Sequence, residues 1–123
     1  MDLQVSSRQN RKKINTAPVR KLIRILGKKL NCRIEDVSVV FVNDATIAGL
    51  NKTWFSKDNP TDVISFPFLD YAADGAVSGE IVISVDRAID QCFRYRNTLA
   101  AEIGRYIVHG FLHLLGFADV PAE

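Results

Sequence analysis

Two histidines near the end of the chain are the residues best suited to chemistry. In "IVHGFLHLLGFAD" (residues 107–119), His109 and His113 lie four positions apart, Gly116 follows three residues later and Asp119 three after that. On a helix, this spacing places both imidazoles on one face about 6 Å apart, which suits two nitrogens that each lie about 2 Å from one metal ion. We expect Gly116 to turn the chain so that Asp119 approaches the same point. Two nitrogens and a carboxylate form a ligand set for one Zn²⁺, or for another divalent metal such as Ni²⁺, and leave a position for water.

The alternative to a metal site is a pair of satisfied histidines on a polar helix face, because two histidines four residues apart are a weak pattern by themselves. Zinc peptidases of the H-E-x-x-H type carry a glutamate after the first histidine as the general base, and here that position is Gly110, which disfavours proteolysis. Glu102 lies on the same face, about 10 Å along the axis from His109. It either orients His109 through Arg105 or water, or is a solvated surface acid.

The charge of the chain is unevenly distributed. Residues 1–33 contain ten of the sixteen lysines and arginines and one acid, which gives a net charge of +9, whereas residues 34–123 contain six basic and thirteen acidic residues, which gives −7. Arg20, Arg24 and Lys28 recur at helical spacing within the basic part, so we expect an outward-facing basic stripe. A concentrated positive surface attracts polyanions, and RNA or DNA is the partner that this stripe predicts.

Length and composition favour one domain over residues 1–123 and a cytoplasmic location. At 123 residues the chain is long enough for a core of its own. The opening "MDLQVSSRQNRKK" has no apolar core, so we do not expect a secretory signal, and no apolar run is long enough to predict a membrane span. Cys32 and Cys92 follow no metal-binding or redox spacing and are expected to be free thiols.

The hydrophobic pattern predicts the elements that position these residues. Strands are expected over 3–5, 37–42, 61–68 and 79–85, with a polar loop over 69–78 between the last two. Helices are expected from an N-cap at Thr16 to about Leu30, from a cap at Asp44 to about Phe55, over Arg87–Arg94, and from about Thr98 to about Leu115. Trp54 is expected on the inner face of the second helix. The order β-α-β-α-β-β-α-α predicts an α+β fold with a mixed four-stranded sheet, packed helices and a central last helix.

Three segments together resemble a known family. "HGFLHLLGFAD", "NPTDVISFPF" (59–68) and "GEIVIS" (79–84) occur in the order and spacing of the YbeY family, which are metal-dependent endoribonucleases of ribosomal RNA maturation. The resemblance extends from about Asp36 to Asp119. It implies a zincin-like metal site on the last helix, with His109, His113 and Asp119 as ligands, although the third ligand of the family is usually histidine. Members of the family commonly continue beyond the position at which this chain ends.

The resemblance also implies roles around the metal. Thr61 and Ser65 would line the substrate cleft, and Asp62 would either support a ligand histidine or cap a turn. The family usually has an arginine at the position of Phe55, where it would hold the scissile phosphate, and Lys57 or Lys52 would have to replace it as a point charge. Trp54 and Phe55 are also candidates for stacking on an unpaired base.

The function implied is a metal-dependent hydrolase that cuts single-stranded RNA and matures the 3′ end of small-subunit ribosomal RNA. Zn²⁺ would supply an activated water, with His109 and His113 as the catalytic histidines. Arg20, Arg24, Lys28 and Lys57, together with Thr61 and Ser65, would bind the substrate. The partners would be ribosomal RNA, the small ribosomal subunit and ribosome-assembly proteins. The alternatives are a catalytically weakened ribosome-associated RNA-binding protein with a structural metal, and a metal-dependent hydrolase of another ester or amide.

Overall fold

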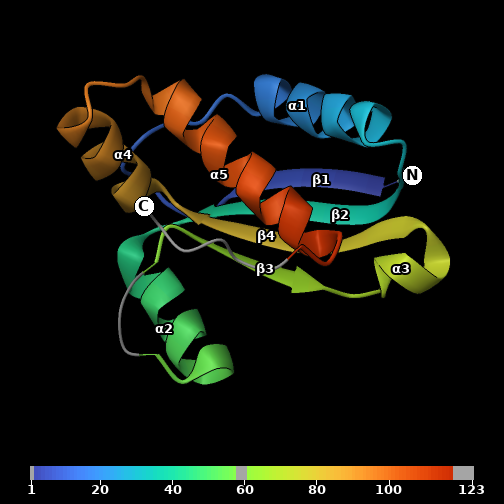
Figure 1. Cartoon of the computed structure of the whole chain (residues 1–123). Coiled ribbons are helices and arrows are strands. Elements are labelled where there is room, and N and C mark those ends of the chain that lie inside the picture. Colours follow the sequence, from blue (N-terminus) through green and yellow to red (C-terminus); the bar gives the residue numbers. More distant parts are fainter. Residues whose placement is uncertain (1, 58–60, 118–123) are drawn as a thin grey trace.

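The computed structural model describes residues 2–57 and 61–117. Its elements along the chain are β1 (Asp2–Ser7), α1 (Thr16–Lys29), β2 (Arg33–Val42), α2 (Asp44–Phe55), β3 (Val63–Pro67), α3 (Tyr71–Asp74), β4 (Ala76–Ser84), α4 (Val85–Arg94) and α5 (Leu99–Leu114) (Figure 1). The predicted order of strands and helices is confirmed, with one correction. The segment 69–78, expected to be a loop, contains the short helix α3 and the first residues of β4.

The four strands form one mixed sheet in the order β1-β2-β4-β3. β1, β2 and β4 are parallel, whereas β3 runs antiparallel to β4, with Val63 opposite Ile83 and Ser65 opposite Ile81. The predicted mixed four-stranded α+β fold is therefore confirmed. β3 is an edge strand, because within the sheet it pairs with β4 alone. Side chains from helices on either face of the sheet can therefore reach its outer edge.

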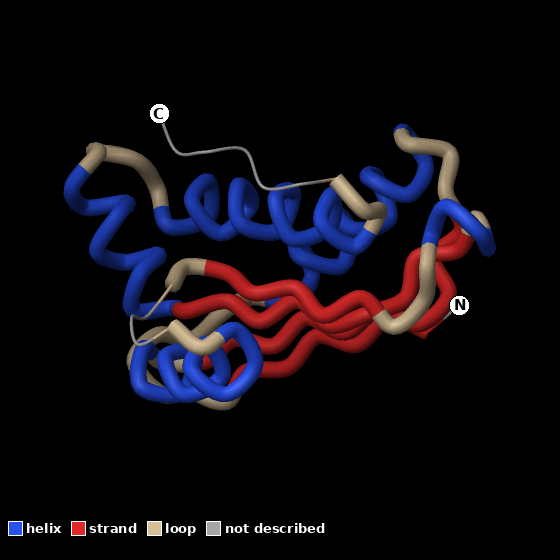
Figure 2. Tube along the Cα trace, turned by 60° about the horizontal axis from the view of Figure 1, so that its bottom comes forward, coloured by secondary structure: helices blue, strands red, loops and turns tan. Residues whose placement is uncertain are grey.

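Helices cover both faces of the sheet unequally. α1, α4 and α5 pack on one face, with α5 between the other two, and α2 lies on the opposite face (Figures 1 and 2). The last helix is thus central, as expected. Side chains of β2 alternate between the two layers, since Val37, Val39 and Phe41 belong to the larger core under α5 and Val40 and Val42 to the smaller core over α2.

Two helix caps and one packing prediction are corrected. The side chain of Asn15, not Thr16, accepts the first backbone hydrogen bond of α1, and Asn43, not Asp44, caps α2. Asp44 instead accepts a hydrogen bond from the Ser84 hydroxyl at 2.6 Å. Trp54, expected to be internal, has 65% of its surface exposed.

None of the helices within residues 2–57 and 61–117 combines the length and the hydropathy that crossing a membrane requires.

Candidate active site

Helix α5 carries both histidines and ends directly after them. The Thr98 side chain accepts a hydrogen bond from the Ala101 backbone N–H at 3.0 Å, which fixes the start of the helix at the predicted residue. Gly116 has a φ of 94°, the left-handed region that favours glycine, and its N–H donates to the His113 carbonyl oxygen at 3.0 Å. The predicted turn at Gly116 is confirmed, and it lies three residues beyond the second histidine.

His109 and His113 project from the same face of α5, as their spacing predicts. Their ring centroids are 6.0 Å apart and their planes differ by 18°. An ion about 2.1 Å from a histidine nitrogen lies about 3.2 Å from the ring centre, so one ion joins two rings whose centres are at most about 6.4 Å apart. The 6.0 Å separation of the two rings lies within this limit. Asp119, the predicted third ligand, lies outside the described residues, and within the described part no group of three or more His, Cys, Asp or Glu side chains is placed to hold a metal.

Gly110, between the two histidines, brings α5 into close contact with the sheet. A Cβ atom at this position would lie 2.7 Å from Ile81 Cγ2 and 3.1 Å from Ser65 Oγ. The Ser65 hydroxyl donates a hydrogen bond to the Gly110 carbonyl oxygen at 3.0 Å. A glutamate at this position, as in H-E-x-x-H peptidases, has no room between the helix and the strands, so the glycine serves packing.

A pocket of about 180 Å³ opens beside the histidines at the β3 edge. α2 and α5 cover opposite faces of the sheet, and both reach this pocket around the edge strand. We call it the histidine pocket; its lining residues are Asn51, Phe55, Lys57, Thr61, Val63, Ile64, Ser65, His109 and His113. The predicted site residues Lys57, Thr61 and Ser65 are therefore next to the two histidines, although they come from different elements.

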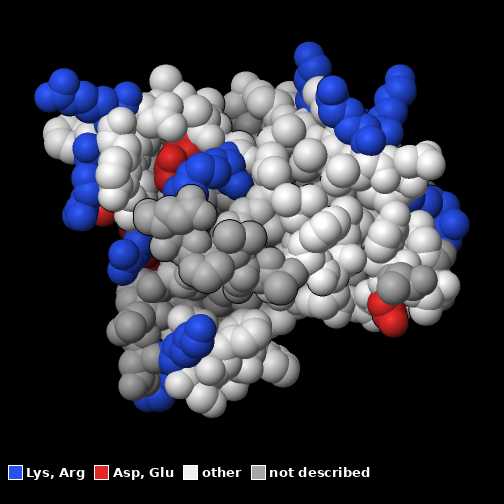
Figure 3. Space-filling view, viewed as in Figure 1, with Lys and Arg blue, Asp and Glu red and all other residues white. Residues whose placement is uncertain are grey.

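The basic stripe lies elsewhere. α1 packs over β1 and β2, toward the sheet edge opposite the histidine pocket. Lys and Arg side chains project from this region with no acidic side chain among them on the face that Figure 3 shows. Arg24 and Lys28 are exposed, but the Arg20 guanidinium donates to the Leu3 carbonyl oxygen at 2.7 Å. Arg20 thus joins α1 to β1 and is not a member of an outward-facing stripe.

Glu102 is a buried acid and not a solvated one. Its carboxylate is 2.6 Å from the Arg105 guanidinium, while only 3% of the residue surface is exposed. The hydrogen bond from Arg105 holds the pKa of Glu102 below its usual range, against the effect of burial, which raises it. Arg105 lies over the Tyr106 ring, 5.1 Å from its centre. Glu102 therefore fixes Arg105 on the surface of α5, one turn before His109.

Two residues in or beside the histidine pocket have roles that the sequence left open or missed. Asp62, between the pocket residues Thr61 and Val63, accepts a hydrogen bond from the Val63 N–H at 2.7 Å at the start of β3, and its two alternative roles stay predictions. Asn51 is buried and lines the histidine pocket, although the sequence analysis did not single it out. The signal for Asn51 was its spacing, since it lies four residues before Phe55 and therefore on the same face of α2.

Comparison with known proteins gives a consistent result. A family model described as "Endoribonuclease YbeY" matches residues 4–123. A protein named Endoribonuclease YbeY from Finegoldia magna is 38% identical over 125 residues, covering 98% of this chain and 82% of its own length. Proteins of the same name from Anaeromyxobacter sp. (strain Fw109-5) and Oceanobacillus iheyensis are 42% and 44% identical over 72% of this chain. The matches to these two span 46% and 63% of their lengths.

A solved structure has the same fold. The solution structure of TM1509 from Thermotoga maritima matches with a TM-score of 0.67 and 24% identity, over 94% of this chain and 73% of that one. At this identity the match concerns the fold alone. The family-model match over nearly all residues, together with relatives at about 40% identity, shows that the chain belongs to the YbeY family of endoribonucleases.

Proposed function

We propose that this chain is a metal-dependent endoribonuclease that hydrolyses phosphodiester bonds in single-stranded RNA. The observation that supports this most directly is the histidine pocket itself. It joins two imidazoles on one helix face with Lys57 and Thr61. Family membership supports the reaction class, because the relatives are named endoribonucleases.

His109, His113 and Asp119 would hold one Zn²⁺, or another divalent ion such as Ni²⁺. When bound, such an ion supplies a Lewis acid that activates water at neutral pH and offsets negative charge on the phosphate. Lys57 provides a second positive charge at the pocket, and Thr61 offers a hydroxyl to a phosphate oxygen. Ser65 already donates its hydroxyl to Gly110, so its contribution is to hold α5 and β3 together beside the substrate.

The proposed biological substrate is ribosomal RNA at the 3′ end of the small subunit, in the cytoplasm and together with ribosome-assembly proteins. The exposed basic residues of α1 support an RNA partner, because they can neutralise backbone phosphates without reading the sequence. Since α1 packs against α5 and α5 against β3, the outer face of α5 offers a path for an RNA that contacts both surfaces.

The test is cleavage of an end-labelled single-stranded oligoribonucleotide by zinc-loaded protein. We expect wild-type protein to release defined fragments and His113→Ala to release none, with the same RNA annealed to its complement as a control that is cut more slowly. Equal product from wild-type and His113→Ala protein would assign the activity to a contaminant and contradict the proposal.

Phe55 supports a second candidate function, an RNA-binding protein that retains a structural metal. This aromatic side chain lines the histidine pocket at the position where the family resemblance implies an arginine. If the chain is a weakened binder, wild-type protein holds RNA without cutting it, and Phe55→Arg gains cleavage. If it is an active enzyme, wild-type protein cuts RNA without that arginine.

A further inference from the structure

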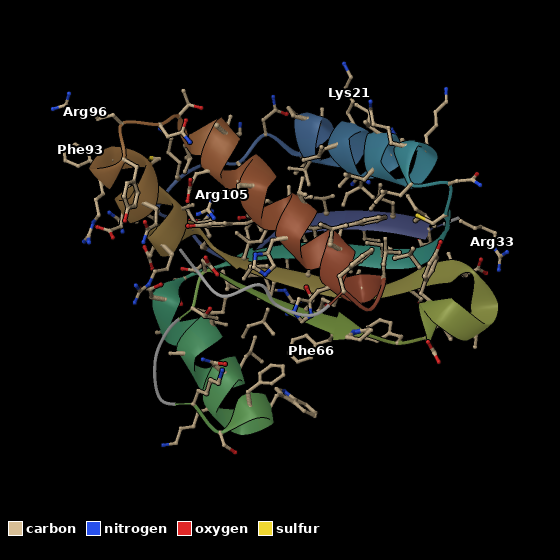
Figure 4. All side chains as sticks on the ribbon, viewed as in Figure 1. Lys21, Arg33, Phe66, Phe93, Arg96 and Arg105 are labelled. Atoms are coloured by element: carbon tan, nitrogen blue, oxygen red, sulfur yellow. The ribbon has the colours of Figure 1, made fainter. Side chains whose placement is uncertain are left out.

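Three aromatic rings meet at the end of α2, and we call them the aromatic trio: Trp54, Phe55 and Phe66. The Phe55 ring stacks on Phe66 with centroids 5.9 Å apart and planes 27° apart. The Trp54 ring meets Phe66 edge-on, with centroids 6.0 Å apart. Figure 4 shows Phe66 between β3 and the last turn of α2. Phe66, which is partly buried against the α2 core, therefore supports the two helix residues from the β3 side.

The two helix residues of the trio are exposed to solvent although both rings contact Phe66. Trp54 is 65% exposed and Phe55 is 45% exposed. Ser56, with a φ of 56°, ends α2 immediately after them, and its N–H donates to the Lys52 carbonyl oxygen at 3.1 Å. Two neighbouring aromatic side chains that are held by a third and still face water indicate an interaction surface.

The trio is continuous with the histidine pocket. Phe55 belongs to both, since it stacks on Phe66 and lines the pocket together with His109 and His113. Lys57, two residues further along, also lines the pocket. If an RNA strand binds with one phosphate near the histidines, the nucleoside next to that phosphate would thus lie over Phe55.

We propose that the aromatic trio is a base-stacking subsite, which holds an unpaired nucleobase next to the phosphate bound in the histidine pocket. This inference deepens the proposed function and rests on it for the identity of the ligand as RNA. A nucleobase fits better than an apolar protein surface because planar ring faces, a lysine and a polar pocket occur side by side. Base stacking on aromatic rings tolerates any sequence and needs a single strand, because a paired base does not expose its face.

The protein contains its own reporter for this subsite, because Trp54 is the one tryptophan of the chain. The experiment titrates protein with single-stranded oligoadenylate and follows the Trp54 fluorescence. It is repeated with oligomers in which one nucleotide is abasic, so that the phosphates remain and one base is missing. We expect saturable quenching, and at one or two positions an abasic substitution should weaken binding by about fivefold to a hundredfold.

Matched variants show whether the aromatic rings cause the effect. Phe55→Leu retains an apolar side chain without a ring face and should lose the sensitivity to the abasic position, whereas Phe55→Tyr should keep it. Phe93→Leu is the control, because Phe93 is 88% exposed but lies at the end of α4 and does not line the histidine pocket. Thermal unfolding of each variant verifies that it is folded.

The outcomes separate this inference from the proposed function. If wild-type protein cuts RNA but abasic substitution has no effect at any position, the subsite is wrong while the enzyme proposal stands. If base-dependent quenching occurs without cleavage, the subsite stands and the enzyme proposal fails. A self-association that buries Trp54 and that Phe55→Leu abolishes, observed by sedimentation without RNA, would make the trio a contact between copies and overturn the subsite.

Discussion

The Ser65 hydroxyl donates a hydrogen bond to the Gly110 carbonyl oxygen at 3.0 Å, and this contact fixes the edge strand β3 against α5 between its two histidines. The hydroxyl can reach the carbonyl because the helix residue at this point has no side chain. The histidines and the strand residues of the pocket are thereby held in one position relative to each other.

Gly110→Ala should destabilise the protein and displace the histidines. A Cβ 2.7 Å from Ile81 Cγ2 overpacks the contact between α5 and the sheet. We expect the free energy of unfolding to fall by about 1–2 kcal/mol, because overpacking outweighs the gain in helix propensity. Gly104→Ala is the matched control, since its Cβ would meet Leu22 at an ordinary 3.8 Å, and it should raise stability by up to about 1 kcal/mol. Urea unfolding measures both, and equal effects would contradict the close contact.

Glu102→Gln should flatten the acid side of the stability profile. The pKa of Glu102 is below its ordinary value of 4.5 in the folded protein, mainly because of the Arg105 hydrogen bond. Its carboxylate therefore stabilises the fold above about pH 4.5, and this contribution is lost as the pH falls through the lowered pKa. We expect the stability advantage of wild-type protein over Glu102→Gln to shrink on acidification in urea titrations.

Glu35→Gln is the control for that experiment. Glu35 pairs with Arg33 at 3.3 Å, but both side chains are more than half exposed, so solvent screens the interaction. Its profile should follow that of the wild-type protein. An advantage over Glu102→Gln that stays constant with pH would show that the Arg105 pair does not lower the pKa of Glu102.

Arg24→Ala combined with Lys28→Ala should weaken the salt dependence of RNA binding. Both side chains are exposed on α1, and each phosphate contact contributes about 0.7 to the slope of log K against log salt for a single strand. We therefore expect the slope to fall by about 1.4 when two contacts are lost. Arg20→Ala should instead lower stability, by about 1 kcal/mol, because its guanidinium binds the Leu3 carbonyl. An unchanged slope in the double variant would exclude Arg24 and Lys28 from the RNA contact.

A chelator should lower the melting temperature of zinc-loaded wild-type protein and leave His113→Ala unaffected. An ion that binds only the folded state stabilises it by about 2.7 kcal/mol at a hundred times its Kd, which corresponds to about 10 °C for a domain of this size. Differential scanning calorimetry with and without the chelator gives the shift. If His113→Ala loses as much as wild-type protein does, the ion is bound somewhere other than the histidine pair.

Local patterns in the sequence were sufficient for the long elements and for the histidine helix, but not for the short helix α3, which was expected to be a loop. The start of α5 at Thr98, its turn at Gly116 and the shared face of His109 and His113 follow from residue type and from the period of the helix. Cap assignments failed by one residue at Thr16 and Asp44. In both places two capping residue types are adjacent, and the hydrogen-bond geometry selected Asn15 and Asn43.

Trp54 shows where a periodic pattern is insufficient. Its spacing from Ile47 and Leu50 places it near the inner face of α2, yet its ring is exposed. Periodicity predicts which side of a helix is apolar, but it does not say how far the surface under that side extends. Trp54, in the last turn of α2, meets Phe66 of β3 edge-on but keeps most of its surface in solvent, so the apolar side of the helix continues past the area that the sheet covers.

By itself, the sequence determined which residues share a helix or strand face, because that depends on φ, ψ and the spacing of neighbours along the chain. It also determined the strong charge of the first 33 residues. Only the tertiary structure decided that Phe55 of α2, Ser65 of β3 and His109 of α5 line one pocket, and that the basic helix α1 lies toward the other edge of the sheet. The physical reason is that these neighbours depend on strand order and on the choice of sheet face for each helix, which are set by the burial of the whole core.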